Sequence, residues 1–137
     1  MFSKGVTEDK IHYFAMEYVD GEDLSSKIKR GVKFTEADAA NIINQACKGL
    51  EAAWKKSIIH RDIKPANIMV TEEGMVKIAD FGIAKSLLAT TSITRNNTYL
   101  GTAHYTSPEQ GKGDKLDHRT DIYSLGIVLY KLLTEKT

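Results

Sequence analysis

The chain has 137 residues, of which 42% are hydrophobic and 27% are charged, and its formal net charge is +1. This is the composition of an ordinary globular domain, and the near-neutral charge gives no reason to expect binding to nucleic acid or to a membrane surface. No apolar run reaches the roughly 20 residues of a membrane span, and the N-terminus lacks the basic and apolar regions of a signal peptide. Because Cys47 is the only cysteine, no disulfide can form within the chain, and we expect a buried thiol in a reducing, cytoplasmic location.

The first half of the chain is predicted to contain one strand and two helices. Residues 10–19 are dense in aromatic and aliphatic side chains, which predicts a strand buried on both faces, and the Asp20-Gly21 pair ends it. Residues 23–30 begin with acidic side chains and end with basic ones before a glycine, which predicts a short helix. Thr35 and Asp38 resemble a capping box, and the helix that they open is expected to run to about residue 56 with one apolar face.

The second half is predicted to contain a hairpin, a long polar stretch and a buried helix. Residues 68–70 and 76–79 are apolar runs joined by a short turn, which predicts a β-hairpin. Residues 83–106 are mostly polar, and long loops of this kind are usually functional or disordered. Residues 111–119 read as a charged loop, and residues 121–133 are apolar nearly all round, which predicts a helix buried in the middle of the fold.

The run from His60 to Asn67 (HRDIKPAN) carries the chemistry of the chain. Asp62, Lys64 and Asn67 place a carboxylate, an ammonium and an amide close together, and Pro65 fixes its own φ and removes a backbone donor, which predicts a loop. Such a loop fits a place where a hydroxyl is deprotonated beside a phosphate and a metal. Taken singly, each of these side chains is better explained as an ordinary surface or hairpin residue.

The order of several short motifs is far more specific than any one of them. After the loop at 60–67 come the hairpin, Asp80-Phe81-Gly82, Gly101-Thr102 and Ser107-Pro108-Glu109. This series resembles the catalytic segment of the protein kinase family, and in particular bacterial-type Ser/Thr protein kinases. A chance match of the whole series is remote.

The resemblance implies an α+β, protein-kinase-like fold that is truncated, with a mainly helical large lobe, short β-hairpins and a remnant of the small-lobe sheet. Residues 1–20 would be the small-lobe remnant, comprising its last strand and the hinge. Residues 21–137 would be the N-terminal half of the large lobe, incomplete at its C-terminus. The sequence has no glycine-rich phosphate cover and no small-lobe lysine strand, so the resemblance implies that this segment alone is inactive or nearly so.

The resemblance also implies a set of catalytic and metal-binding roles. Asp62 would be the base that accepts the proton of the substrate hydroxyl, and Lys64 would lie against the transferring phosphate. Asn67 and Asp80 would hold Mg²⁺ through oxygen, which suits a hard cation. Thr102 would hydrogen-bond Asp62 and Lys64, a marker of Ser/Thr substrates.

Four residues are implied to contact ATP. Met16 would stand at the back of the nucleotide pocket, and Met69 would form the apolar floor under the adenine. The C=O of Glu17 and the N–H of Val19 would bond the adenine edge, although backbone groups make side-chain identity weak support. The alternatives from the residues alone are an ordinary edge strand for residues 10–19 and a core filler for Met69.

Two residues are implied to regulate the segment. Arg61 beside Asp62 resembles the class of kinases controlled by a phosphate on the polar stretch, which could pair with Arg61 and order that stretch. Thr94 matches the phosphorylated position best, and the alternative is that it is an ordinary loop hydroxyl. The resemblance also implies that Phe81 packs against His60 and that Asp121 accepts hydrogen bonds from the backbone of the loop. The hydroxyls that compete with Thr94 are those of Thr90, Thr91, Ser92 and Thr98.

The function that the resemblance implies is a protein serine/threonine kinase, which transfers the γ-phosphate of ATP, with Mg²⁺, to Ser/Thr hydroxyls of protein substrates. The alternative is a non-catalytic kinase-like remnant that acts as an interaction module. Its basis is the expected truncation, which would leave the helix at 121–133 uncovered and allow self-association through its apolar surface. No nucleic-acid partner and no membrane segment are expected in this chain.

Overall fold

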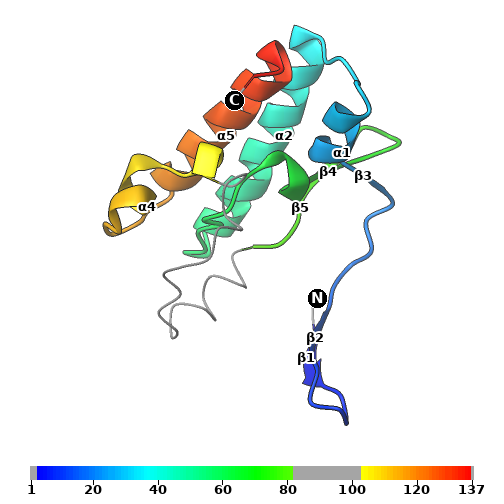
Figure 1. Ribbon diagram of the computed structural model, residues 1–137, viewed down its shortest axis with the longest axis vertical. Helices are drawn as coiled ribbons and strands as arrows, with labels where there is room; N and C mark the ends of the chain where they lie inside the picture. The colour runs from blue at the N-terminus through cyan, green and yellow to red at the C-terminus, as the bar shows by residue number, and fades with distance from the viewer. Residues whose placement is uncertain (1–2, 82–102, 137) are drawn as a thin grey trace.

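The computed structural model describes residues 3–81 and 103–136. A small hairpin stands apart from a body in which helices pack on a three-stranded sheet (Figure 1). The hairpin consists of β1 (Ser3–Val6) and β2 (His12–Ala15). The body contains the strands β3 (Gly21–Asp23), β4 (Ile68–Thr71) and β5 (Val76–Ile78), the helices α1 (Leu24–Lys29), α2 (Glu36–Trp54), α4 (Pro108–Lys112) and α5 (Arg119–Thr134), and the single 3₁₀ turns Pro65–Asn67 and Ala103–Tyr105.

The two predicted N-terminal helices are confirmed, and their caps explain where they begin. The side chain of Asp23 accepts a hydrogen bond of 2.9 Å from the N–H of Ser26 at the start of α1. Thr35 and Asp38 form the predicted capping box, with Asp38 N–H bonded to Thr35 Oγ1 at 3.1 Å and Thr35 N–H bonded to Asp38 Oδ2 at 3.0 Å. Each cap satisfies amide groups that the first helical turn leaves without a partner.

The three-stranded sheet has the order β3-β4-β5 and is antiparallel throughout. The predicted hairpin at residues 68–79 is therefore confirmed. Strand β3 was not expected, because Asp20-Gly21 was interpreted only as the end of a strand. Gly21 pairs with Thr71, and a Cβ at Gly21 would lie 2.7 Å from the carbonyl oxygen of Val70. The absence of a side chain at Gly21 thus permits the close approach of β3 to β4.

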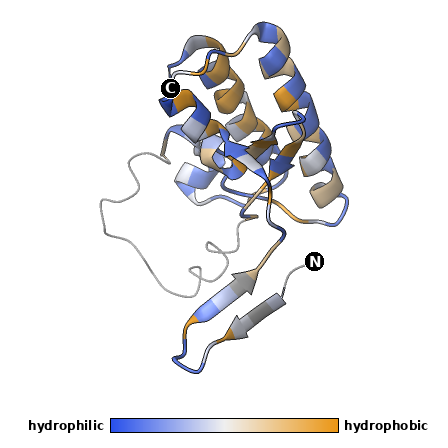
Figure 2. Ribbon diagram, turned by 90° about the vertical axis from the view of Figure 1, so that its right-hand side faces the viewer, coloured by the Kyte–Doolittle hydropathy of each residue, from blue (hydrophilic) through white to orange (hydrophobic). Residues whose placement is uncertain are grey.

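The core lies between α2, α5 and the sheet, where Figure 2 shows hydrophobic residues along the helices that face one another. Buried residues of α2 recur every three or four positions, as the predicted apolar face requires. The side chain of Gln45 joins α2 to the β4–β5 turn, since its Oε1 accepts from Val76 N–H and its Nε2 donates to Gly74 C=O, both at 3.0 Å. The buried core residues are Leu24, Ala39, Ile42, Ala46, Leu50, Ile63, Ile68, Leu125, Val128 and Leu132.

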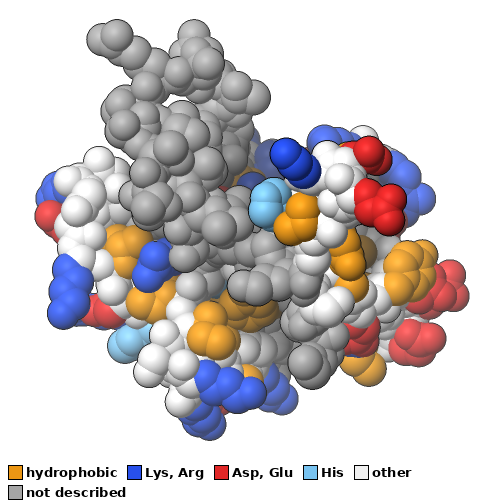
Figure 3. All heavy atoms as spheres, turned by 90° about the horizontal axis from the view of Figure 1, so that it is seen from below, with side chains coloured by type: hydrophobic (Ala, Val, Ile, Leu, Met, Phe, Trp, Pro, Cys, Tyr) orange, Lys and Arg blue, Asp and Glu red, His pale blue; other side chains and the backbone are white. Residues whose placement is uncertain are grey.

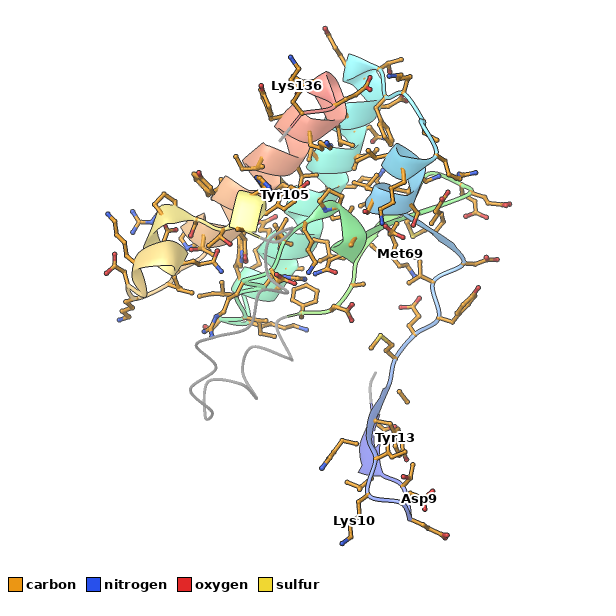
Figure 4. The ribbon with its side chains drawn as sticks, viewed as in Figure 1. Asp9, Lys10, Tyr13, Met69, Tyr105 and Lys136 are labelled. Atoms are coloured by element: carbon orange, nitrogen blue, oxygen red, sulfur yellow. The ribbon has the colours of Figure 1, made fainter. Side chains whose placement is uncertain are left out.

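The prediction of a strand at residues 10–19 buried on both faces is wrong. Only His12–Ala15 form a strand, and Ile11 and Tyr13 are 62% and 48% exposed. Among the described residues, β2 pairs with β1 alone. Figure 4 shows the labelled Asp9, Lys10 and Tyr13 in this projecting hairpin, away from the helices. The apolar side chains are exposed because no second layer of described residues packs on the hairpin.

Two further predictions of burial are wrong. Cys47 is exposed, because it follows the buried Ala46 on α2 and a step of one residue turns the side chain by about 100°. Helix α5 is buried on one face only. On the face of the molecule drawn in Figure 3, hydrophobic side chains lie in small patches among charged ones. No helix among the described residues is both long and apolar enough to cross a membrane. The large apolar side chains exposed on α5 are Ile122, Tyr123, Tyr130 and Leu133.

Candidate functional site

The predicted loop at residues 60–67 brings its three chemical groups together. The ammonium of Lys64 lies 2.8 Å from Asp62 Oδ2. The amide nitrogen of Asn67 donates to Asp62 twice, at 2.8 Å to its carbonyl oxygen and at 3.2 Å to Oδ2. Pro65 is the first residue of a single 3₁₀ turn, a position that suits the fixed φ of proline. The carboxylate of Asp62 is therefore held between a cation and an amide.

The buried carboxylate of Asp121 fixes the start of this loop. Its Oδ2 accepts from His60 N–H at 2.9 Å and from the indole N–H of Trp54 at 3.0 Å. Its Oδ1 accepts from Arg61 N–H at 2.9 Å. Charge-assisted hydrogen bonds of this kind offset the cost of burying a carboxylate. The expectation that Asp121 ties α5 to the loop backbone is confirmed, and the contribution of Trp54 was not expected.

The imidazole of His60 connects the loop to the end of β5. Its Nε2 lies 2.9 Å from the carbonyl oxygen of Ala79, which can only accept, and its Nδ1 accepts from Asp62 N–H at 3.2 Å. These two contacts require the neutral ring with the proton on Nε2. Burial lowers the pKa of His60 below its ordinary value, although the nearby carboxylates of Asp121, Asp62 and Asp80 act in the opposite direction.

The expected contact between Phe81 and His60 is confirmed, with ring centroids 4.7 Å apart and planes tilted by 51°. Ala79 is bound through both of its backbone groups, because its N–H also donates to Asn67 C=O at 2.9 Å. Asp80 follows directly and has a φ of 55° in the left-handed region. The position of Asp80 is therefore set by bonds to the loop that holds Asp62.

A cavity of about 480 Å³ lies beside Asp80 and has a mostly apolar lining. Met16, Glu17 and Val19, which were expected to contact adenine, line this cavity together with Asp80. Lys77 forms an ion pair with Glu17, and this contact lowers the pKa of Glu17. The remaining lining comes from α2, the segment after it and the end of β5, namely Gly49, Ala52, Ala53, Lys56, Ile58, Ile78, Ala79 and Phe81.

Met69, the fourth residue expected at the adenine, has a different position. It lies in β4, opposite Asp23 of β3 and Lys77 of β5 (Figure 4). It is not among the described residues that line the cavity. Thr94 and Thr102 lie outside the described residues.

The donor set near the loop fits Mg²⁺ held mainly by phosphate and water. Among residues 3–81 and 103–136, no group of three His, Cys, Asp or Glu side chains converges as a complete metal site. Mg²⁺ usually binds through one or two carboxylates together with substrate phosphates. Asn67 directs its amide nitrogen to Asp62, and its side-chain oxygen is therefore the atom that would coordinate a cation. The carboxylate of Asp80 would be the second oxygen ligand for such a cation.

A second cavity, of about 420 Å³, is lined in part by Glu109, Asp117 and Arg119, which are bound to their neighbours. The guanidinium of Arg119 lies 2.8 Å from the carboxylate of Asp117 and lowers the pKa of that carboxyl to about 2. The hydroxyl of Thr120 donates to Glu109 at 2.7 Å and lowers the pKa of that carboxyl. None of the residues predicted to act on ATP or substrate lines this cavity, so the first cavity and the adjoining loop are the stronger candidate site.

Two contributors to the site have no assigned role in the sequence interpretation. Trp54 lies within the helix that was expected to run to about residue 56, and because a buried indole N–H usually needs an acceptor, its presence could have signalled a bonded acceptor nearby. Gln110 donates from its side chain to Arg61 C=O at 2.8 Å. No local pattern in the sequence signals that second contact.

Comparison with known proteins agrees with these observations. The family model described as the protein kinase domain matches residues 2–137. A probable serine/threonine-protein kinase of Clostridium perfringens is 53% identical over 128 residues, which cover 93% of this chain and 18% of the relative. The serine/threonine-protein kinase PrkC of Bacillus subtilis is 46% identical over 127 residues (93% of this chain, 19% of the relative). The serine/threonine-protein kinase PknB of Mycobacterium tuberculosis is 46% identical over 123 residues, which cover 89% of this chain and 20% of the relative. The chain spans about a fifth of the length of these relatives.

Proposed function

This chain belongs to the protein kinase family, and from that membership we propose that it is a catalytic segment of a serine/threonine-protein kinase. The reaction is transfer of the γ-phosphate of ATP to Ser or Thr hydroxyls of protein substrates. The observation that carries the proposal is the bonded network of Asp62, Lys64 and Asn67, which reaches Asp80 through His60 and Ala79. Phosphoryl transfer depends on this kind of positioning and charge stabilisation more than on covalent work by the protein.

Each side chain of the network has a role that its contacts support. Asp62 accepts the proton of the substrate hydroxyl as that oxygen attacks the phosphorus. Lys64, whose ammonium lies 2.8 Å from Asp62, stabilises negative charge on the transferring phosphate. Asn67 Oδ1 and the Asp80 carboxylate would hold Mg²⁺, which when bound would neutralise charge on the phosphates of ATP.

The cavity beside Asp80 is the proposed site of the adenine. Met16 would limit its depth, and the backbones of Glu17 and Val19 would bond the adenine edge, since all three line the cavity. Met69 remains a proposal from family resemblance as the floor of that site. By the same resemblance, residues 1–20 belong to the small lobe and its hinge, and residues 21–137 belong to the large lobe.

Two proposed roles rest on family resemblance alone. Thr102 would bond Asp62 and Lys64 and favour Ser/Thr substrates. Phosphorylation of Thr94 would add a charge that pairs with Arg61.

A non-catalytic interaction role is the second candidate function. The observation that favours it is the row of half-exposed apolar side chains on α5, where Ile122 and Tyr130 are 52% and 51% exposed. Self-association through this row would bury apolar surface and would not require Asp62.

A radiolabelled phosphate-transfer assay tests the proposed function. Transfer is measured for two proteins, each with ATP, Mg²⁺ and a Ser/Thr peptide. The first is this chain alone, and the second is the Clostridium perfringens relative in which this chain replaces the matching segment. We expect transfer in the exchanged protein to fall by about 10²-fold or more on Asp62→Asn, as loss of a general base does. Full transfer by Asp62→Asn would contradict the base role, and concentration-dependent association without any transfer would favour the second candidate.

A further inference from the structure

The side-chain amide of Gln110 contacts two distant parts of the chain. Its Oε1 accepts from the N–H of Ser107 at 3.1 Å, which completes a capping box at the start of α4. Its Nε2 donates to the C=O of Arg61 at 2.8 Å. One side chain thus joins the first turn of α4 to the loop that carries Asp62.

The peptide group between Arg61 and Asp62 is bound on both of its sides. Its carbonyl oxygen accepts from Gln110, and its N–H donates to Nδ1 of His60 at 3.2 Å. A peptide plane with both polar groups engaged cannot rotate without losing one of these bonds. The direction in which the backbone enters Asp62 is therefore set partly by Gln110.

Gln110 also closes a circuit of hydrogen bonds that runs through α5. Arg61 N–H bonds to Asp121, and the neighbouring Thr120 lies with its Oγ1 3.0 Å from Ser107 Oγ. Ser107 and Gln110 cap α4 together, and Gln110 returns the circuit to Arg61. Figure 1 shows α4 beside the start of α5, and Figure 4 places Tyr105 next to α5, where Ser124 donates to its carbonyl oxygen. A displacement of α4 would therefore shift the peptide group between Arg61 and Asp62 and change the orientation of Asp62.

We infer that Gln110 is a positioning residue for Asp62, which couples the segment at 103–110 to the orientation of the proposed base. The consequence for catalysis rests on the proposed function, in which Asp62 is the base. The coupling itself rests only on the bonds of Gln110, Arg61 and His60. The required chemistry is specific, since the residue at 110 must accept from Ser107 and donate to Arg61 at the same time.

Gln110→Glu separates the two contacts. The carboxylate keeps an acceptor for Ser107 N–H and so preserves the capping box, but it has no donor for Arg61 C=O. Gln110→Met is a neutral second variant of similar shape, which serves if the charged variant does not fold. Asn44→Asp makes the same amide-to-carboxylate exchange at an exposed position of α2 and is the matched control.

The test is amide hydrogen exchange at Asp62 in the full 137-residue chain, with the thermal midpoint measured in parallel. We expect exchange at Asp62 to rise at least about tenfold in Gln110→Glu or Gln110→Met, with the core amides of α2 and the Asn44→Asp control unchanged. Unchanged exchange at Asp62 in both Gln110 variants would overturn the inference.

Phosphate transfer by the chain exchanged into the Clostridium perfringens relative provides the second readout. We expect Gln110→Glu to lower kcat about tenfold or more and to leave the KM for ATP within about twofold, because misplaced catalytic groups act on the chemical step. Absence of transfer by the exchanged protein without a substitution at Gln110 would count against the proposed function and not against the coupling. Equal kcat values in an active wild type and Gln110→Glu would overturn the catalytic part of the inference.

Discussion

The indole nitrogen of Trp54 donates a hydrogen bond of 3.0 Å to the buried carboxylate of Asp121. The same carboxylate binds the backbone at the start of the candidate catalytic loop. The last residue of α2 and the first turn of α5 are thereby attached to one point of the loop. This arrangement makes the loop part of the folded core, because neither helix can shift without breaking a bond to Asp121.

Trp54→Phe should destabilise the fold through this bond. Phenylalanine preserves most of the apolar contact but has no donor, and a hydrogen bond to a charged group contributes about 1.5–3 kcal/mol. We expect the free energy of unfolding to fall by about that amount in urea titrations. Tyr130→Phe, at a half-exposed position of α5, is the matched aromatic control. Equal unfolding midpoints for Trp54→Phe and the wild type would contradict the importance of the bond.

The stability of the fold should depend on pH through His60. Its folded-state pKa is below the ordinary value of 6.5 because of burial, so the unfolded chain binds the proton more readily. The free energy of unfolding is therefore expected to decrease as the pH falls below about 6.5 towards the lowered folded-state value. His60→Gln, which can still donate and accept, should flatten the stability curve between about pH 7 and 5. A curve of unchanged slope in His60→Gln would refute this assignment.

Asp80→Asn should remove the dependence of nucleotide binding on Mg²⁺. The amide lacks the negative charge that a hard cation prefers, so we expect the affinity for ATP with Mg²⁺ to fall about tenfold or more. Affinity without Mg²⁺ should change little, and titration calorimetry under both conditions measures the difference. Asp114→Asn, at an exposed position after α4, is the control. Equal Mg²⁺ dependence in Asp80→Asn and the wild type would exclude Asp80 as a ligand.

Gln45→Glu should loosen the β4–β5 hairpin from α2. The variant keeps an acceptor for Val76 N–H but loses the donor to Gly74 C=O. We expect a loss of about 1–2 kcal/mol in the free energy of unfolding, as for a polar group left without its partner. Asn44→Asp introduces the same charge one position earlier, where the side chain is exposed. If both variants unfold at the same denaturant concentration, the hydrogen bond from Gln45 to Gly74 makes no measurable contribution to the free energy of unfolding.

The parts of the fold that depend on neighbouring residues were predictable from the sequence. Asp23 and the Thr35–Asp38 pair mark the starts of α1 and α2, because a cap and its partner lie within one helical turn. Asp62, Lys64 and Asn67 come together for the same reason, since the loop that joins them is short. Local spacing contains enough information to place such groups.

Two contacts between distant residues were not predicted, whereas the bonds of Asp121 to the loop backbone were implied by family resemblance. Trp54 and Asp121 are 67 residues apart, and Gln110 and Arg61 are 49 residues apart. Their meeting depends on how α2, α4 and α5 pack, which no local pattern specifies. The exposure of Cys47 was missed because hydrophobic neighbours in the sequence do not indicate which face of a helix a residue occupies.

Arg61 and Asp80 have φ values of 66° and 55°, a conformation that costs a non-glycine residue about 1–3 kcal/mol. The bonds of Arg61 to Asp121 and of Ala79 to His60 and Asn67 hold the backbone around both residues. Evolution of greater heat resistance would therefore favour glycine at these two positions, while selection for the proposed roles of Asp80 at Mg²⁺ and of Arg61 at a phosphate would oppose it. At Arg61 and Asp80, thermal stability and activity therefore favour different amino acids.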